Sequence, residues 1–78
     1  MTYEELLEWI AEVFEELAEN ITPETRRDDV KGWDSLGILT LMAALDEEFD
    51  IQLSEAELFE TQTVEDILEI FRKHGHLE

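Results

Sequence analysis

One serine stands where a side chain that takes part in chemistry is expected. The segment Gly32-Trp33-Asp34-Ser35-Leu36 places a hydroxyl at the junction between a polar loop and the most apolar stretch of the chain. A serine that acts as a nucleophile needs a base and a further group that holds the base. The only histidines, His74 and His76, lie in a C-terminal segment that we expect to be frayed. We therefore predict no hydrolase triad, no catalytic residue and no enzymatic activity.

The sequence also gives little support for a metal-binding site. The chain has no cysteine, which excludes a disulfide, a thiolate metal site and a cysteine nucleophile. His74 and His76 supply two ligands on a mobile tail, which makes a weak site. An EF-hand loop that begins at Asp28 would need glycine at its sixth position and glutamate at its twelfth, where Trp33 and Leu39 stand. We predict no metal site.

The charge of the chain limits its partners. Twenty-two acidic residues face five basic ones, for a net charge of −17. Such a surface repels nucleic acids and anionic lipids, and it attracts proteins that carry Lys/Arg patches. The longest apolar-rich run, residues 36–45, is far shorter than the roughly 20 residues of a membrane helix. We expect a cytoplasmic monomer that binds neither nucleic acid nor membrane.

The elements that position Ser35 are predicted to be helices. A first helix over residues 2–19 is indicated by Thr2 with Glu5, a capping-box pair, and by Pro23 beyond its end. Its inner stripe has helical spacing and consists of Tyr3, Leu6, Leu7, Ile10, Val13, Phe14 and Leu17. A long surface loop follows over residues 20–33.

Three further helices follow the loop. The second begins at Asp34 or Ser35, with Asp34 as a plausible N-cap, and runs to about Phe49. Ser54 with Glu57 and Thr63 with Asp66 predict helices over residues 55–60 and 64–74. The fold class is therefore all-α, a small bundle of three longer helices and one short one. We expect a single domain over residues 1–78, with residues 75–78 as a flexible tail.

The segment around the serine resembles a known family. Asp34-Ser35-Leu36 matches the attachment motif of acyl and peptidyl carrier proteins, and residues 44–51, Ala-Leu-Asp-Glu-Glu-Phe-Asp-Ile, look like the end of their second helix. Length, acidity and helix pattern agree, so the resemblance covers residues 3–74. The form Gly-Trp-Asp-Ser-Leu resembles stand-alone carriers of specialised pathways.

The resemblance implies an acyl carrier protein. Ser35 would receive 4′-phosphopantetheine from coenzyme A through a phosphopantetheinyl transferase, and the thiol of that arm would carry acyl groups as thioesters in fatty-acid, polyketide or related biosynthesis. Asp34 would present the serine, and Leu36 would fill the core or border the arm. An acidic helical interaction module without a cofactor is the alternative, and a small enzyme or cation buffer is a third reading.

Two further sets of residues follow from the resemblance. Candidates for the lining of an acyl pocket, which could equally be core residues, are Leu39, Met42, Ala43, Leu53, Leu58 and Ile67. Candidates for docking of enzymes with basic or apolar patches are Ile38, Leu41, Met42, Asp46 and Glu47. Gly37 and Thr40 stand where many fatty-acid-type carriers have acidic residues, so we expect apolar contact to dominate recognition.

Overall fold

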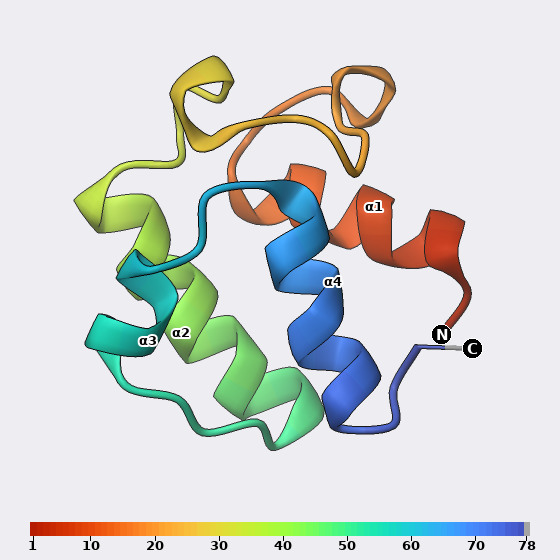
Figure 1. Ribbon diagram of the computed structural model, residues 1–78, viewed down its shortest axis with the longest axis vertical. Coiled ribbons are helices and arrows are strands. Elements are labelled where there is room, and N and C mark those ends of the chain that lie inside the picture. Colours follow the sequence, from red (N-terminus) through yellow and green to blue (C-terminus); the bar gives the residue numbers. More distant parts are fainter. Residues whose placement is uncertain (78) are drawn as a thin grey trace.

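The computed structural model describes residues 1–77. Within them, four α-helices follow in the order α1 (Tyr3–Val13), α2 (Ser35–Phe49), α3 (Glu55–Phe59) and α4 (Val64–Lys73). Two single turns of 3-10 helix, Ala18–Asn20 and Arg27–Asp29, interrupt the long connection between α1 and α2. Figure 1 shows α3 beside α2 and the long connection arching over one end of the molecule. The predicted all-α bundle of three longer helices and one short helix is confirmed.

Each helix begins where its capping residue predicts. The Thr2, Ser54 and Thr63 side chains accept hydrogen bonds from the backbone N–H three residues later, and the acidic residue at that position bonds back to the cap. These reciprocal pairs satisfy N–H groups that the first turn leaves free. All three predicted capping boxes are confirmed, and α2 begins at Ser35 with Asp34 as its N-cap.

The end of α1 differs from the prediction. The helix stops at Val13 and not near residue 19, because Glu15 turns into the left-handed conformation at φ 55°. The Glu16 N–H donates to Ala11 O at 2.8 Å and the Glu15 N–H to Glu12 O at 3.2 Å, which is a Schellman motif.

A contact distant in sequence explains this early end. Gly32 lies so close to the carbonyl oxygen of Phe14 that a Cβ on Gly32 would collide with it. A helical carbonyl points along the axis toward the next turn, so Gly32 occupies the space that a continued helix would need. The loop therefore ends α1, and the apolar spacing of residues 14–17 does not reveal this.

Side chains from all four helices, including Leu6, Leu41, Leu58 and Phe71, are fully buried in one core. An aromatic cluster lies at the end of the core where α2 ends. In it, the Phe49 and Phe71 rings lie 4.9 Å apart, and Trp9 meets both rings edge-on. The Trp9 indole N–H donates to a Glu48 carboxylate oxygen at 3.0 Å, which satisfies the polar end of the ring. This cluster joins α1, α2 and α4.

The long connection between α1 and α2 is tied to the α3–α4 link. The Arg27 backbone N–H donates to Gln62 O at 2.8 Å, and the Val64 N–H donates to Thr25 O at 2.9 Å. The Arg27 guanidinium donates to Phe59 O at 2.8 Å, at the carboxyl end of α3, where a cation is favourable. The predicted loop is therefore anchored at its middle, and this fixes the approach to Ser35.

The last described residues make specific contacts. The Met1 ammonium donates to His76 O at 2.8 Å, the His76 ring packs against Phe49, and Leu77 packs against the core. The predicted flexibility of residues 75–78 stays a prediction, and Glu78 lies outside the described residues. No helix within residues 1–77 has the length and apolar character needed to cross a membrane.

Candidate functional site

Ser35 is the first residue of α2, and its side chain is exposed. The residue that caps the helix is its neighbour, since the Asp34 Oδ1 accepts a hydrogen bond from the Gly37 N–H at 2.9 Å. Asp34 itself is extended, with φ −118° and ψ −165°. The Ser35 hydroxyl is therefore not needed to start the helix, and it is presented to solvent at the helix N-terminus.

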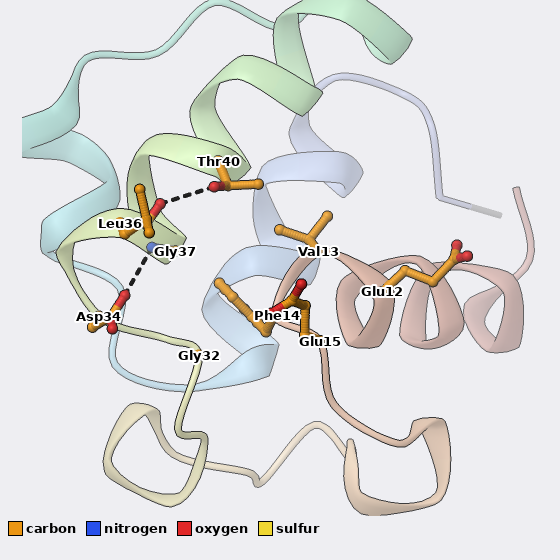
Figure 2. Close-up of a pocket in the computed structure, with 9 residues that line it drawn as sticks. All are labelled: Glu12, Val13, Phe14, Glu15, Gly32, Asp34, Leu36, Gly37 and Thr40. Carbon is orange, nitrogen blue, oxygen red and sulfur yellow. Dashed lines mark hydrogen bonds between the residues drawn. The ribbon is translucent and has the colours of Figure 1, made fainter.

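Two glycines hold this helix start against the rest of the molecule. A Cβ on Gly37 would collide with the carbonyl oxygen of Gly32, just as a Cβ on Gly32 would collide with that of Phe14. The loop thus lies with its backbone directly against the end of α1 and against the first turn of α2, and Figure 2 shows the Phe14 side chain beside this junction. Such contact between backbones fixes the position of Ser35 relative to α1.

An aromatic stack supports the same junction. The Trp33 and Phe14 rings lie 5.0 Å apart at 14°, and both side chains are buried. The buried Trp33 indole N–H has no hydrogen-bond partner within residues 1–77. The role of Phe14, Trp33 and Gly32 in positioning the serine is not predicted from the sequence. The Gly-Trp pair directly before Asp34 was the available signal.

Leu36 is exposed, with 72% of its surface accessible. Of the two places that the sequence analysis left open, the core and the border of an attached group, the structure therefore excludes the core. A large apolar side chain so exposed beside Ser35 is available for contact with a group or protein that approaches the serine.

A groove opens beside Ser35, between the end of α1 and the start of α2. Its volume is about 350 Å³, and both neighbours of Ser35 line it (Figure 2). Acidic and apolar residues both contribute to the lining, which consists of Glu12, Val13, Phe14, Glu15, Gly32, Asp34, Leu36, Gly37 and Thr40. This groove is not predicted from the sequence, because it depends on the early end of α1.

A second cavity brings together three of the six candidates for an acyl pocket. Met42, Ala43 and Leu53 line it with Asp46 and Gln52, and its volume is about 240 Å³. The other three candidates lie elsewhere. Leu58 and Ile67 are fully buried core residues, and Leu39 is 40% exposed on α2 without lining this cavity.

Two of the docking candidates are wrong. Ile38 and Leu41 are 1% and 0% exposed, because they lie three residues apart on the α2 face that packs into the core. Met42 is half-buried, whereas Asp46 and Glu47 are exposed. The large apolar side chains that α2 does present are Leu36 and Leu39.

Gly37, which was expected to mark a missing acidic residue on the surface, is instead a packing residue. It is buried against Gly32, so the acid missing at this position reflects backbone packing and not a change of surface charge. Thr40 is exposed, and its hydroxyl donates to Leu36 O at 2.9 Å. Of the two positions, only Thr40 is exposed.

The start of α2 at Ser35 has fewer acidic residues than the starts of the other helices, so it can hold an anionic group despite the negative net charge of the chain. The first turns of α1, α3 and α4 each carry two acidic residues, but the first turn of α2 carries none. Its free N–H groups and the positive end of the helix dipole can accommodate a phosphate, with Asp34 as the nearest negative charge in sequence. In the described part of the chain, no three acidic or histidine side chains are grouped so as to hold a metal ion.

The chain is similar to known proteins over a range of residues that includes Ser35. A family model described as the phosphopantetheine attachment site matches residues 4–71. An acyl carrier protein of Clostridium acetobutylicum is 34% identical over 74 residues, which cover 95% of this chain and 96% of that protein. An acyl carrier protein of Syntrophobacter fumaroxidans is 38% identical over 56 residues, which cover 72% of this chain and 69% of that protein.

Proposed function

The chain belongs to the acyl carrier protein family, and on that premise we propose that it holds acyl intermediates as thioesters on an arm attached to Ser35. It would present them to enzymes of fatty-acid, polyketide or related biosynthesis. The observation that carries the proposal is the placement of Ser35, an exposed hydroxyl at the start of α2 that is free of the capping role and rigidly held.

The cofactor of the family is covalently bound 4′-phosphopantetheine. When bound, it supplies a terminal thiol that holds acyl groups as thioesters, which a chain without cysteine cannot do itself. The residues around Ser35 fit its phosphodiester, because the first turn of α2 is free of acids and offers backbone N–H groups. Asp34 holds the helix start in place, and Leu36 offers an apolar wall beside the attachment point.

The cavity lined by Met42, Ala43 and Leu53 is our candidate for the entrance of an acyl chain. Leu53 and Met42 are half-buried and pack against the hydrophobic core, which includes the fully buried Leu58 and Ile67. A chain that enters here would displace these half-buried side chains and then reach the core. Leu39 lies on the exposed surface of α2 and is better suited to protein contact.

Partners are proposed to dock on the exposed surface of α2. Leu36 and Leu39 would supply apolar contact, while Asp46 and Glu47 would attract Lys/Arg patches. The proposed partners are a phosphopantetheinyl transferase and enzymes that load or remove acyl groups. We propose that the protein has no catalytic activity of its own, binds neither nucleic acid nor membranes, and works as a monomer in the cytoplasm.

Intact mass spectrometry tests the proposal. The protein is incubated with coenzyme A and a phosphopantetheinyl transferase of broad specificity, and we expect the mass to rise by one phosphopantetheinyl group. Ser35→Ala should gain none, whereas Ser54→Ala, which removes another helix-start hydroxyl, should gain one. Circular dichroism controls for folding of both variants. Modification at Ser54 or Thr63, or a folded wild type that gains no mass, would contradict the proposal, and the latter would favour an interaction module without a cofactor.

A further inference from the structure

We propose that the groove between the end of α1 and the start of α2 is the resting site of the unloaded phosphopantetheine arm. The groove lies on the α1 side of Ser35, and Met42, Ala43 and Leu53 of the proposed acyl entrance take no part in it. The inference rests on the proposed attachment at Ser35, and it assigns a separate place to the arm when no acyl group is attached.

The first argument is the position of the groove relative to the attachment point. Asp34 and Leu36, the residues on either side of Ser35, both line it. Ser35 itself does not line the groove, so a group bonded to Ser35 starts next to the groove and enters it by passing Leu36 or Asp34. Tethering gives such a group an effective concentration in the millimolar range, so that even weak contacts suffice to hold it in place.

The second argument is size. The groove has a volume of about 350 Å³, within the range of about 300–1,000 Å³ that is usual for small-molecule sites. The cavity at Met42, Ala43 and Leu53 measures about 240 Å³ and falls below that range. Without rearrangement of side chains, the groove is thus the larger of the two sites for an arm of this kind.

The third argument is chemical. Beyond its phosphate the arm is uncharged and alternates a dimethyl-substituted carbon with hydrogen-bond donors, one hydroxyl and two amide N–H groups. Glu15 lines the groove, and its carboxylate is an acceptor for such donors; hydrogen bonds to a carboxylate are stronger than those between neutral groups. Leu36, Val13 and Phe14 supply apolar surface for the dimethyl group and the methylenes.

The end of α1 creates this site. If α1 continued to residue 19, Glu15 would lie on the helix and not at its end. The Schellman turn instead places Glu15 at the position where glycine is usual, and its side chain lines the groove. The close contacts of Gly32 with Phe14 and of Gly37 with Gly32 fix the opposite wall relative to this turn.

A spin label on the arm tests the inference. Because the chain has no cysteine, the thiol of the arm is the only thiol in the protein, and a nitroxide maleimide will label it alone. Two-dimensional NMR of the labelled protein should show loss of the amide signals of Glu12, Val13 and Glu15. The signals of Gln52 and Leu53 should be retained. Loss at Gln52 and Leu53 with retention at Glu12 and Val13 would overturn the inference.

Two variants separate a bound arm from one that is merely tethered nearby. Thr40→Phe should fill the groove, and Leu36→Ala should remove one of its walls. Both are exposed positions whose replacement leaves the core intact. Each should restore the Glu12 and Val13 signals, whereas the matched control Leu39→Ala, on the same helix but outside the groove, should leave them lost.

Signal loss that persists in both Thr40→Phe and Leu36→Ala would show that proximity alone causes it, and would overturn the inference. The mass measurement keeps the two proposals apart. A protein that gains no phosphopantetheinyl group contradicts the proposed function. A protein that gains the group at Ser35 but retains the Glu12 and Val13 signals contradicts only the proposed resting site.

Discussion

The region around the start of α2 and the region around the cavity at Met42 differ in how tightly they are packed. At the attachment end, formed by Phe14, Gly32, Trp33 and residues 34–37, backbone lies directly on backbone and two aromatic rings are stacked and buried. At the cargo face, formed by Met42, Ala43 and Leu53, the side chains are half-buried or exposed around an open cavity.

This difference matches the two tasks that we propose. A group that many enzymes must reach is best held on a rigid support, and contact between backbones allows little adjustment. A face that shelters cargo of various sizes needs side chains that can move apart, and half-buried residues around a cavity can do so at low cost. The predictions below test whether the attachment end is indeed the less tolerant of the two.

The largest contrast is expected between Phe14→Ala and Leu53→Ala. Phe14 is buried and stacked on Trp33, so its truncation should lower the free energy of unfolding by about 3–5 kcal/mol. Leu53 is half-buried beside an existing cavity, and its truncation should cost about 1 kcal/mol. Urea unfolding followed by circular dichroism measures both, and equal losses would contradict the comparison.

The next contrast concerns the addition of methyl groups. Gly37→Ala gains about 1 kcal/mol of helix propensity but must move the Gly32 backbone, so we expect a net loss of about 2 kcal/mol. Ala43→Leu adds three carbons to the exposed cargo face and should change stability by about 0.5 kcal/mol or less. The same urea titrations apply. A Gly37→Ala variant as stable as the wild type would show that the junction can relax.

A smaller effect distinguishes the two neighbours at the helix start. Asp34→Ala removes the side chain that accepts from the Gly37 N–H and should cost about 1 kcal/mol. Ser35→Ala removes a hydroxyl with no capping role and should cost about 0.5 kcal/mol or less, although we expect it to abolish phosphopantetheine attachment. Thermal unfolding of both variants measures the difference. The reverse order of stabilities would show that Ser35 supports the fold.

The smallest effect is expected from pH, at the turn that shapes the groove. A hydrogen bond from the Leu17 N–H, and a second from the Asn20 side chain, hold the pKa of Glu16 below its ordinary value. A carboxyl with a depressed pKa stabilises the folded state above its unfolded pKa, and this contribution is lost as the pH falls through the folded pKa.

Wild type should therefore lose slightly more stability than Glu16→Gln as the pH falls through the ordinary carboxyl range of about 4 to 5 and below. Glu8→Gln removes the same charge from an exposed position on α1 and serves as the control. Melting temperatures measured across this range give the comparison. Parallel pH profiles of wild type and Glu16→Gln would contradict the expected contribution.

Much of the fold follows from local sequence. Thr2, Asp34, Ser54 and Thr63 predict the starts of the helices because each cap bonds to the N–H three residues later, within one turn of chain. The Asp-Ser-Leu motif, together with chain length, acidity and helix pattern, likewise makes Ser35 the predicted attachment residue from sequence alone. Such features need no partner distant in sequence, so a single sequence suffices to find them.

Tertiary structure decided what depends on distant neighbours. The end of α1 at Val13, the packing role of Gly37 and the groove beside Ser35 all follow from where the loop meets the two helices, and the burial of Ile38 and Leu41 follows from the packing of α2 into the core. The apolar pattern of residues 36–45 runs nearly all round the helix, so periodicity cannot tell its buried face from its exposed one. The contact of Gly32 with Phe14 and Gly37 decides where α1 ends, and packing against the other helices decides which face of α2 is buried, because both bring together segments that are far apart in sequence.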